Sequence, residues 1–297
     1  MMDGDPPKQE EPMRWQGRRE SRNIEDRRGM RVPGGRGAGF GCGTLVLVLV
    51  VAWLTGADPR QLLGLLGAVE QMAPPQTQSQ VPAGPPPADD PQARFVSVVL
   101  ADTEDAWHQI LQGQYQEPTL VLFDGQVSSA CGFASAAVGP FYCPADRKVY
   151  LDLSFFRDLS QRFGAPGDFA QAYVVAHEVG HHVQNLLGVS DRVSALQQRA
   201  RSQEEANSLS VRLELQADCF AGVYGNHNRQ YLDPGDVEEG LGAAAAIGDD
   251  RMQRRGEGYV APESWTHGSS DMRARWLRRG LETGDPESCD TFDAPDL

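Results

Sequence analysis

The feature that constrains this chain most is an uncharged stretch of 21 residues, 37–57, whose centre at 45–51 reads Leu-Val-Leu-Val-Leu-Val-Val. About 20 apolar residues form a helix long enough to cross the hydrocarbon of a bilayer. The 36 residues that precede it are too many for the charged start of an ordinary secretion signal, so an uncleaved anchor is preferred to a cleaved signal. The sequence therefore predicts one transmembrane helix at 37–57.

The segments on either side of this stretch have compositions that disfavour a packed core. Residues 1–36 carry nine basic and seven acidic side chains and have no apolar period, which predicts a disordered arm. Residues 58–91 form a linker that is rich in proline after residue 73, which is typical of a semi-rigid spacer. By the positive-inside rule we expect the arginine-rich arm to stay in the cytoplasm, with the C-terminal part of the chain outside the inner or plasma membrane.

This division leaves residues 92–285 as the folded domain, followed by a C-terminal tail at 286–297. Residues 95–111 have helical spacing, whereas 119–123 and 149–153 read as short strands. The expected helices that follow are 168–188, one opening at 190, 207–224, 236–247 and 269–281. A few strands followed by a run of helices indicate an α+β fold with a small β-hairpin or sheet packed on a helical bundle.

The chain is acidic, with 27 Lys and Arg against 41 Asp and Glu and a formal net charge of -14. Proteins that grip nucleic acid need a basic face to neutralise phosphates. We therefore expect no nucleic-acid partner.

The second strong feature is the sequence His-Glu-Val-Gly-His at 177–181. On a helix His177 and His181 share one face, so both imidazoles can reach one cation, and zinc accepts neutral imidazole nitrogen. Glu178 is placed to take a proton from a zinc-bound water without being a ligand itself. A chance occurrence of the motif is the alternative, but the surrounding helix is apolar, and buried histidines and carboxylates need partners.

A third ligand is needed to complete a zinc site. The metzincin pattern requires Gly and His at seven and ten residues after the first histidine, where this chain has Gln184 and Leu187. Glu214 and Asp218 instead lie four residues apart on one face of a later amphipathic helix. We expect Glu214 to bind zinc and Asp218 to accept a hydrogen bond from a histidine ligand, which fixes its tautomer.

These residues carry a resemblance to a known family. Residues 177–184 together with 214–218 are similar to gluzincin-type zinc metallopeptidases and, more narrowly, to the bacterial "putative neutral zinc metallopeptidase" family of membrane-anchored proteins. Further matching segments are 131–136, 139–144, 149–156 and 266–270 followed by Arg273. The resemblance covers roughly residues 94–290 and implies a zincin-like fold and peptidase chemistry without fixing a substrate. It also implies a hairpin within 131–153 whose edge strand pairs with extended peptide.

Related zinc peptidases place a late His or Tyr beside the metal to stabilise the oxyanion of the tetrahedral intermediate. The resemblance thus makes His267 a catalytic candidate, and Tyr142 or Tyr150 could serve instead. His182 follows the second zinc ligand on a different helical face, and we interpret it as structural.

Four cysteines in the predicted domain are disulfide candidates: Cys131, Cys143, Cys219 and Cys289. An exported domain favours disulfides, and the candidate pairings are a hairpin bond between the first two and a second bond between the last two. Four cysteines allow three connectivities, and the sequence alone does not choose among them. Zinc binding by these cysteines is disfavoured because no C-x-x-C spacing is present.

The sequence hypothesis is a membrane-anchored zinc metalloendopeptidase that hydrolyses peptide bonds of a peptide or protein substrate. Zinc is the expected cofactor, Glu178 the general base, and the domain is expected outside the cytoplasm. The alternative is a catalytically inactive, zinc-stabilised extracytoplasmic binding module. Glu178 argues against it, because a purely structural site has no use for a base.

Overall fold

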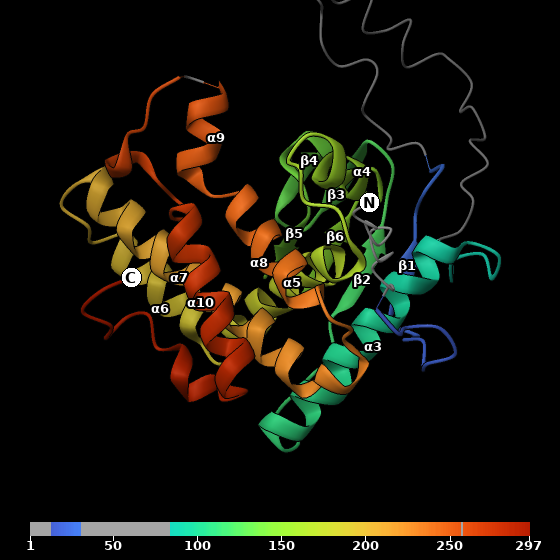
Figure 1. Ribbon diagram of the computed structural model, residues 1–297. Helices are drawn as coiled ribbons and strands as arrows, with labels where there is room; N and C mark the ends of the chain where they lie inside the picture. Colours follow the sequence, from blue (N-terminus) through green and yellow to red (C-terminus); the bar gives the residue numbers. More distant parts are fainter. Residues whose placement is uncertain (1–12, 31–83, 257) are drawn as a thin grey trace, which may run out of the picture. The chain divides into compact units, whose positions relative to one another are not determined.

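The computed structural model describes residues 13–30, 84–256 and 258–297 (Figure 1). The predicted transmembrane helix at 37–57 and most of the 58–91 linker lie outside these residues. Within the described part of the chain, no helix combines the length and the apolar character that a membrane crossing requires.

A small mixed sheet forms one layer of the fold. In strand order across the described residues it contains β1 (Ile24–Asp26), β2 (Thr119–Leu122), β6 (Lys148–Leu151) and β5 (Phe141–Cys143). Strand β2 pairs in parallel with β1 and β6, whereas β5 pairs antiparallel with β6. Three consecutive residues of β2 are fully buried, as expected for a strand that is covered on both faces. A second hairpin joins β3 (Gln126–Ser129) to β4 (Gly132–Ser135).

Helices form the rest of the domain. They are α3 (Pro91–Leu111), α4 (Ser154–Gln161), α5 (Asp168–Leu186), α6 (Val189–Gln197), α7 (Gln203–His227), α8 (Asp236–Ala246), α9 (Asp249–Gly256) and α10 (Ser270–Thr283). Helix α5 contacts β5 and β6 on one side and α7 and α8 on another, so it joins the sheet to the helical bundle (Figure 1). The helices α7 and α10 pack together along much of their length.

The α+β class predicted from the sequence is confirmed. Helix α3 begins slightly earlier than its apolar period indicated, because the Asp90 side chain accepts hydrogen bonds from the Gln92 and Ala93 amides. Helix α4 and helix α9 were not predicted. Both are only eight residues long, and α9 is mostly polar, so neither has a long apolar period.

The prediction of a disordered arm at 1–36 is wrong for the part that the structure describes. Residues 13–28 pack on the domain, and β1 forms an edge of the main sheet. The charged composition predicted disorder wrongly because the arm's charges are not left in solvent. Its arginines pair with acidic side chains of the domain, and Met13 and Ile24 enter the core.

The tail that follows Asp285 also packs on the domain. Residues Pro286–Cys289 form a short 3-10 helix, and Thr291 is buried. The Arg212 guanidinium on α7 donates to the main-chain carbonyls of Thr291, Phe292 and Ala294. The tail is therefore continuous with the helical bundle.

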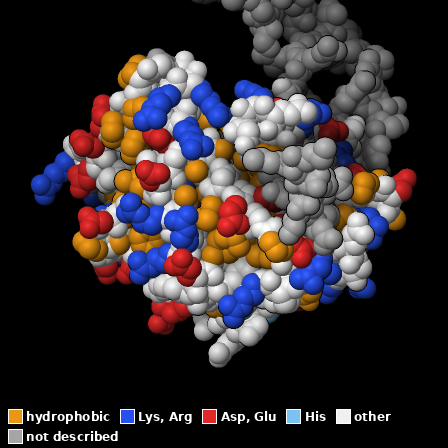
Figure 2. Space-filling model, viewed as in Figure 1, with side chains coloured by type: hydrophobic (Ala, Val, Ile, Leu, Met, Phe, Trp, Pro, Cys, Tyr) orange, Lys and Arg blue, Asp and Glu red, His pale blue; other side chains and the backbone are white. Residues whose placement is uncertain are grey.

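Charged side chains on the viewed surface are mixed in sign. Figure 2 shows Lys and Arg interspersed with Asp and Glu and with hydrophobic side chains on this face. The described residues also form exposed ion pairs such as Arg162–Asp158 at 3.1 Å and Arg94–Glu20 at 2.9 Å. Such exposed pairs contribute little stability individually.

Candidate metal centre

Two histidines and a glutamate of the predicted motif lie on helix α5. The helix is buried because its neighbours are small or apolar, and His177 and Glu178 are both less than a tenth exposed. The imidazole rings of His177 and His181 have centroids 4.8 Å apart and lie at 90° to one another. The four-residue spacing thus brings both rings to one side of the helix, as predicted.

Glu214 on α7 reaches the same point. Its Oε2 is 3.2 Å from His177 Nε2, and its Oε1 is 3.4 Å from His181 Nε2. Ligands about 2.1 Å from a tetrahedral zinc lie roughly 3.4 Å from one another, so these separations fit such an ion. In the described part of the chain, His177, His181 and Glu214 form a group whose ligand atoms all lie within 4.8 Å of one another. Two imidazoles and one carboxylate are also the donor set of one class of catalytic zinc sites.

The close approach of α5 and α7 depends on Gly180. A Cβ at this position would lie 3.0 Å from the Ala217 carbonyl oxygen and 3.2 Å from the Ala217 Cα. Backbone atoms cannot move aside as a flexible side chain can, so any larger residue would separate the helices. Gly180 therefore allows Glu214 to reach the histidines.

A buried polar cluster lies behind His177. Asp218 Oδ1 accepts from His177 Nδ1 at 2.8 Å, which leaves Nε2 directed at the metal position. Tyr173 donates its hydroxyl to the same carboxylate at 2.6 Å. Arg273 of α10 donates from Nε and Nη2 to the two oxygens of Asp218, each at 2.9 Å. The predicted orienting role of Asp218 thus has its geometry, and the arginine supplies the balancing charge.

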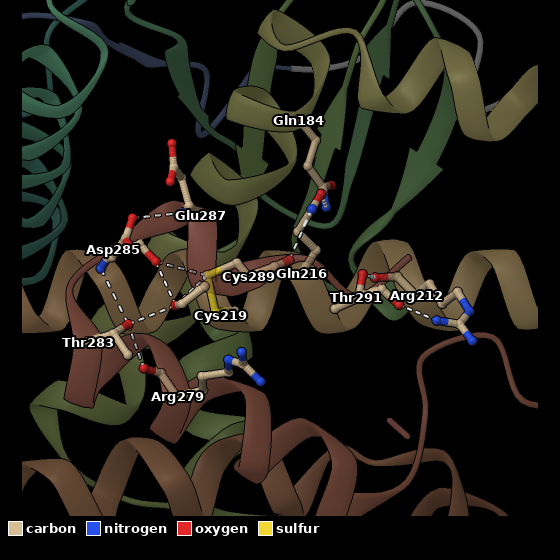
Figure 3. The surroundings of a disulfide bond; sticks show 11 residues. Gln184, Arg212, Gln216, Cys219, Arg279, Thr283, Asp285, Glu287, Cys289 and Thr291 are labelled. Carbon is tan, nitrogen blue, oxygen red and sulfur yellow. Dashed lines mark hydrogen bonds between the residues drawn. A yellow bond between two sulfur atoms is a disulfide. The ribbon is translucent and has the colours of Figure 1, made fainter. Parts of the chain in front are cut away.

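His181 has a different partner. Its Nδ1 lies 2.9 Å from Gln184 Oε1, and the Gln184 amide donates to the Leu213 carbonyl at 2.7 Å and to Gln216 Oε1 at 3.1 Å. The Gln216 amide donates in turn to the main-chain carbonyl of Cys289 at 3.1 Å (Figure 3). A carbonyl can only accept, so it fixes the direction of the whole series and makes His181 Nδ1 the donor. His181 Nε2 is then free to bind a metal.

The charges of the site shift the pKa values of its groups. Burial raises the pKa of Glu178, which suits a base that must take a proton near neutral pH. Burial alone would lower the pKa of His177, but the carboxylates of Asp218 and Glu214 outweigh it and raise that pKa to about 10. Burial alone would raise the pKa of Glu214, yet the two facing histidines hold it well below its usual range.

The ligands open onto a cleft of about 690 Å³. Its walls include residues 136–142 from the sheet side, Phe155 and Phe163, and residues of α6 and α9. Glu178 and His267 both line it. The His267 side chain is about half exposed, and its Nδ1 lies 3.3 Å from Asp249 Oδ1. That hydrogen bond raises the pKa of His267.

The tyrosines that were alternatives to His267 are differently placed. Tyr142 lines the cleft, but its hydroxyl contacts His182 Nδ1 and Asn185 Nδ2, each at 3.0 Å. Tyr150 is buried in β6 and donates its hydroxyl to Asp146 Oδ2 at 2.7 Å. His182 is buried with Tyr142 and with the Gln116 carbonyl at 2.5 Å as partners, and burial lowers its pKa to about 4. This environment agrees with a structural role for His182.

The four cysteines form two disulfides, in one of the three possible connectivities. Cys131 bonds to Cys143 with a Cα–Cα distance of 5.8 Å, and Cys219 bonds to Cys289 at 5.6 Å. The second bond joins α7, one residue after Asp218, to the C-terminal tail (Figure 3).

Several residues of this site were given no role from the sequence. Arg273 and Asp249 come from distant parts of the chain, and no local pattern announces their partners. Tyr173 precedes His177 by four residues, and Gln184 follows His181 by three. Both therefore lie on the face of α5 that carries the ligands, which is a signal that could have identified them.

The sequence of this chain is similar to those of known proteins. Residues 13–292 match the model of the family described as "Putative neutral zinc metallopeptidase". The chain is 49% identical over 296 residues to the uncharacterised protein YpfJ of Escherichia coli K12, covering 94% of this chain and 99% of the relative. It is 46% identical over 262 residues to the uncharacterised protein Rv2575 of Mycobacterium tuberculosis H37Rv, covering 83% and 86%. No solved structure matches the chain.

Proposed function

Because the chain belongs to the family described as "Putative neutral zinc metallopeptidase", we propose that it is a zinc-dependent endopeptidase acting at the cleft beside His177, His181 and Glu214. One observation carries this proposal. Three ligand atoms converge at a spacing that fits zinc, and the buried Glu178 lines the same open cleft. When bound there, zinc would polarise the scissile carbonyl and lower the pKa of water.

Glu178 has the environment that a general base requires. Its raised pKa allows the carboxylate to accept a proton from the attacking water and later to donate it to the leaving amine. Asp218 and Gln184 meanwhile hold the imidazoles of the two ligands in one tautomer each. These residues act by position and do not exchange protons with substrate.

His267 is our candidate for stabilising negative charge on the scissile carbonyl oxygen. It lines the cleft, and Asp249 engages its Nδ1. The pKa raised by Asp249 favours a protonated ring, which can donate a hydrogen bond from Nε2. Tyr142 is less suited, because its hydroxyl is already engaged by His182 and Asn185.

The sheet supports binding of an extended peptide. Strand β5 lies at an edge of the four-stranded sheet in the described residues, and Phe141 and Tyr142 of that strand line the cleft. A peptide can add to such an edge through main-chain hydrogen bonds. The apolar walls at Phe155 and Phe163 favour hydrophobic side chains next to the cleaved bond.

The two disulfides support a location outside the cytoplasm, where such bonds persist. We therefore extend the proposal to an extracytoplasmic peptidase.

Two substitutions test the mechanism. In Glu178→Gln, we expect zinc to remain bound at one ion per chain while cleavage of a denatured protein is lost. In His177→Ala, we expect both to be lost. Glu204→Gln, at an exposed carboxylate of α7, is the matched control and should keep both. Full activity in Glu178→Gln would overturn the mechanism.

A zinc-stabilised binding module remains the rival function. It predicts stoichiometric zinc in the unaltered protein and no cleavage in a broad peptide-library digest. The cleft that contains Glu178 favours the enzyme, because a structural zinc site is normally closed by protein ligands.

A further inference from the structure

The chain leaves the main sheet and returns to it at one point. In β1, Ile24 pairs with Leu120 of β2, and Arg27 then donates its amide to the Leu122 carbonyl at 2.8 Å. The Asp26 amide donates to the carbonyl of Gly84 at 2.7 Å. Thus the residue before the segment 27–83 and the residue after it are hydrogen-bonded to each other.

The docked arm (residues 13–28) is held to the domain by ion pairs and hydrogen bonds to buried carboxylates of α3. Arg18 donates to Asp102 of α3 at 2.6 Å, where the carboxylate is 5% exposed, and its guanidinium stacks 3.3 Å from the ring centroid of Tyr231. Ser21 donates its hydroxyl to the buried Glu104 carboxylate at 2.5 Å. The arm supplies these partners, so undocking it would break the charge-assisted hydrogen bonds to both carboxylates, which disfavours an undocked arm.

Apolar contacts also hold the arm on the domain. Met13 and Ile24 are buried in the main core, and Trp15 packs edge-on against Phe95 of α3 with ring centroids 5.6 Å apart. The match to the family model likewise begins at residue 13. The arm is therefore part of the folded domain.

This docking conflicts with a single crossing of a membrane between the arm and the domain. The hydrocarbon of a bilayer is about 30 Å thick, so one crossing would separate Asp26 from Gly84 by at least that distance. We infer that residues 13–28 and 84–297 lie on the same side of any membrane that the protein contacts.

The arginines of the arm then have an explanation other than membrane orientation. Arg19 pairs with Glu104 at 2.9 Å and with Asp105 at 2.8 Å, and Arg28 pairs with Asp90 at 2.6 Å. Under the positive-inside rule, such arginines indicate that a segment stays in the cytoplasm. Here they complement the acidic side chains at the start and along the length of α3.

Thiol labelling of the full chain tests this inference. Cys42 is the cysteine outside the two disulfides, so Cys42→Ala gives the background. Arg22→Cys in the arm and Glu282→Cys in the domain each introduce an exposed thiol. Intact cells are treated with a membrane-impermeant maleimide, with permeabilised cells as the control for reactivity.

We expect the two thiols to be labelled to the same extent in intact cells. Labelling of one and protection of the other until permeabilisation would overturn the inference. Equal protection of both would support it and would instead overturn the extracytoplasmic location proposed above. The outcome does not depend on peptidase activity, so the two proposals can fail separately.

A second pair of variants tests docking in the membrane-bound protein. Arg18→Met removes the partner of Asp102, whereas Arg22→Met alters an exposed arginine of the same arm. In native membranes we expect protease to digest the domain several-fold faster in Arg18→Met and at an unchanged rate in Arg22→Met. Equal rates in the two variants would show that the arm is not docked.

Discussion

Replacing Arg273 by methionine tests the buried cluster behind the metal ligands. The Arg273 and Asp218 side chains are 4% and 0% exposed and share two hydrogen bonds of 2.9 Å. Methionine fills similar space but carries no charge. Removing one partner of a buried ion pair costs about 3–5 kcal/mol, because the other charge stays buried. In the metal-free protein at neutral pH the protonated His177 still faces Asp218, so the lower end of this range applies. We expect a loss of that size in the free energy of unfolding.

The structure also predicts how this loss combines with a second change. Asp218→Asn should destabilise the protein by a comparable amount, because it leaves the guanidinium of Arg273 unpaired. In the double variant neither group is charged, so its loss should be smaller than the sum of the single losses by about 1 kcal/mol or more. Since Asp218 also orients His177, every variant that lacks its carboxylate should bind zinc about 10–100-fold more weakly.

Urea unfolding of the metal-free protein at neutral pH measures these quantities. Arg278→Met is the matched control, because Arg278 is exposed on the same helix as Arg273. We expect it to change the free energy of unfolding by less than about 0.5 kcal/mol. A loss below about 1 kcal/mol in Arg273→Met, or equal losses in the two arginine variants, would refute the reasoning.

Three further predictions concern metal binding. Because the pKa of His177 is raised to about 10 without metal, zinc must displace a proton, so zinc affinity should rise as the pH rises toward 10, with proton release seen by calorimetry in buffers of different ionisation enthalpy. Gln184→Leu should weaken zinc binding about 10–100-fold in a chelator competition, whereas Gln203→Leu, remote from the ligands, should not. Gly180→Ala should lower both zinc affinity and melting temperature, whereas Gly242→Ala, with open space around its Cβ position, should leave zinc affinity unchanged.

The sequence could predict the ligands because their signal is local. His177 and His181 are one helical turn apart, and Glu214 and Asp218 repeat the same spacing on a later helix. Each pair therefore lies on one face whatever the rest of the chain does. The structure adds only that the two faces meet.

The remainder required contacts between distant residues. Arg273 is 55 residues beyond Asp218, and nothing in its own helix shows that its charge is buried. The prediction of a disordered arm failed for the same reason. A three-residue strand is too short to show a period, and the partners of the arm's arginines lie on α3. Composition describes how many charges a segment has but not whether another segment supplies their complements.

The order in which the site is assembled has a consequence for the cell that makes this protein. His177, Glu178 and His181 precede Arg273 by about a hundred residues, and Cys289, whose carbonyl ends the series of hydrogen bonds that begins at His181, comes later still. A ribosome would therefore expose the ligand helix well before the groups that hold it in place. A chain still being synthesised, or one that terminates before α10, would lack the groups that hold the candidate metal ligands in place, so the sequence order delays completion of the centre until the end of synthesis.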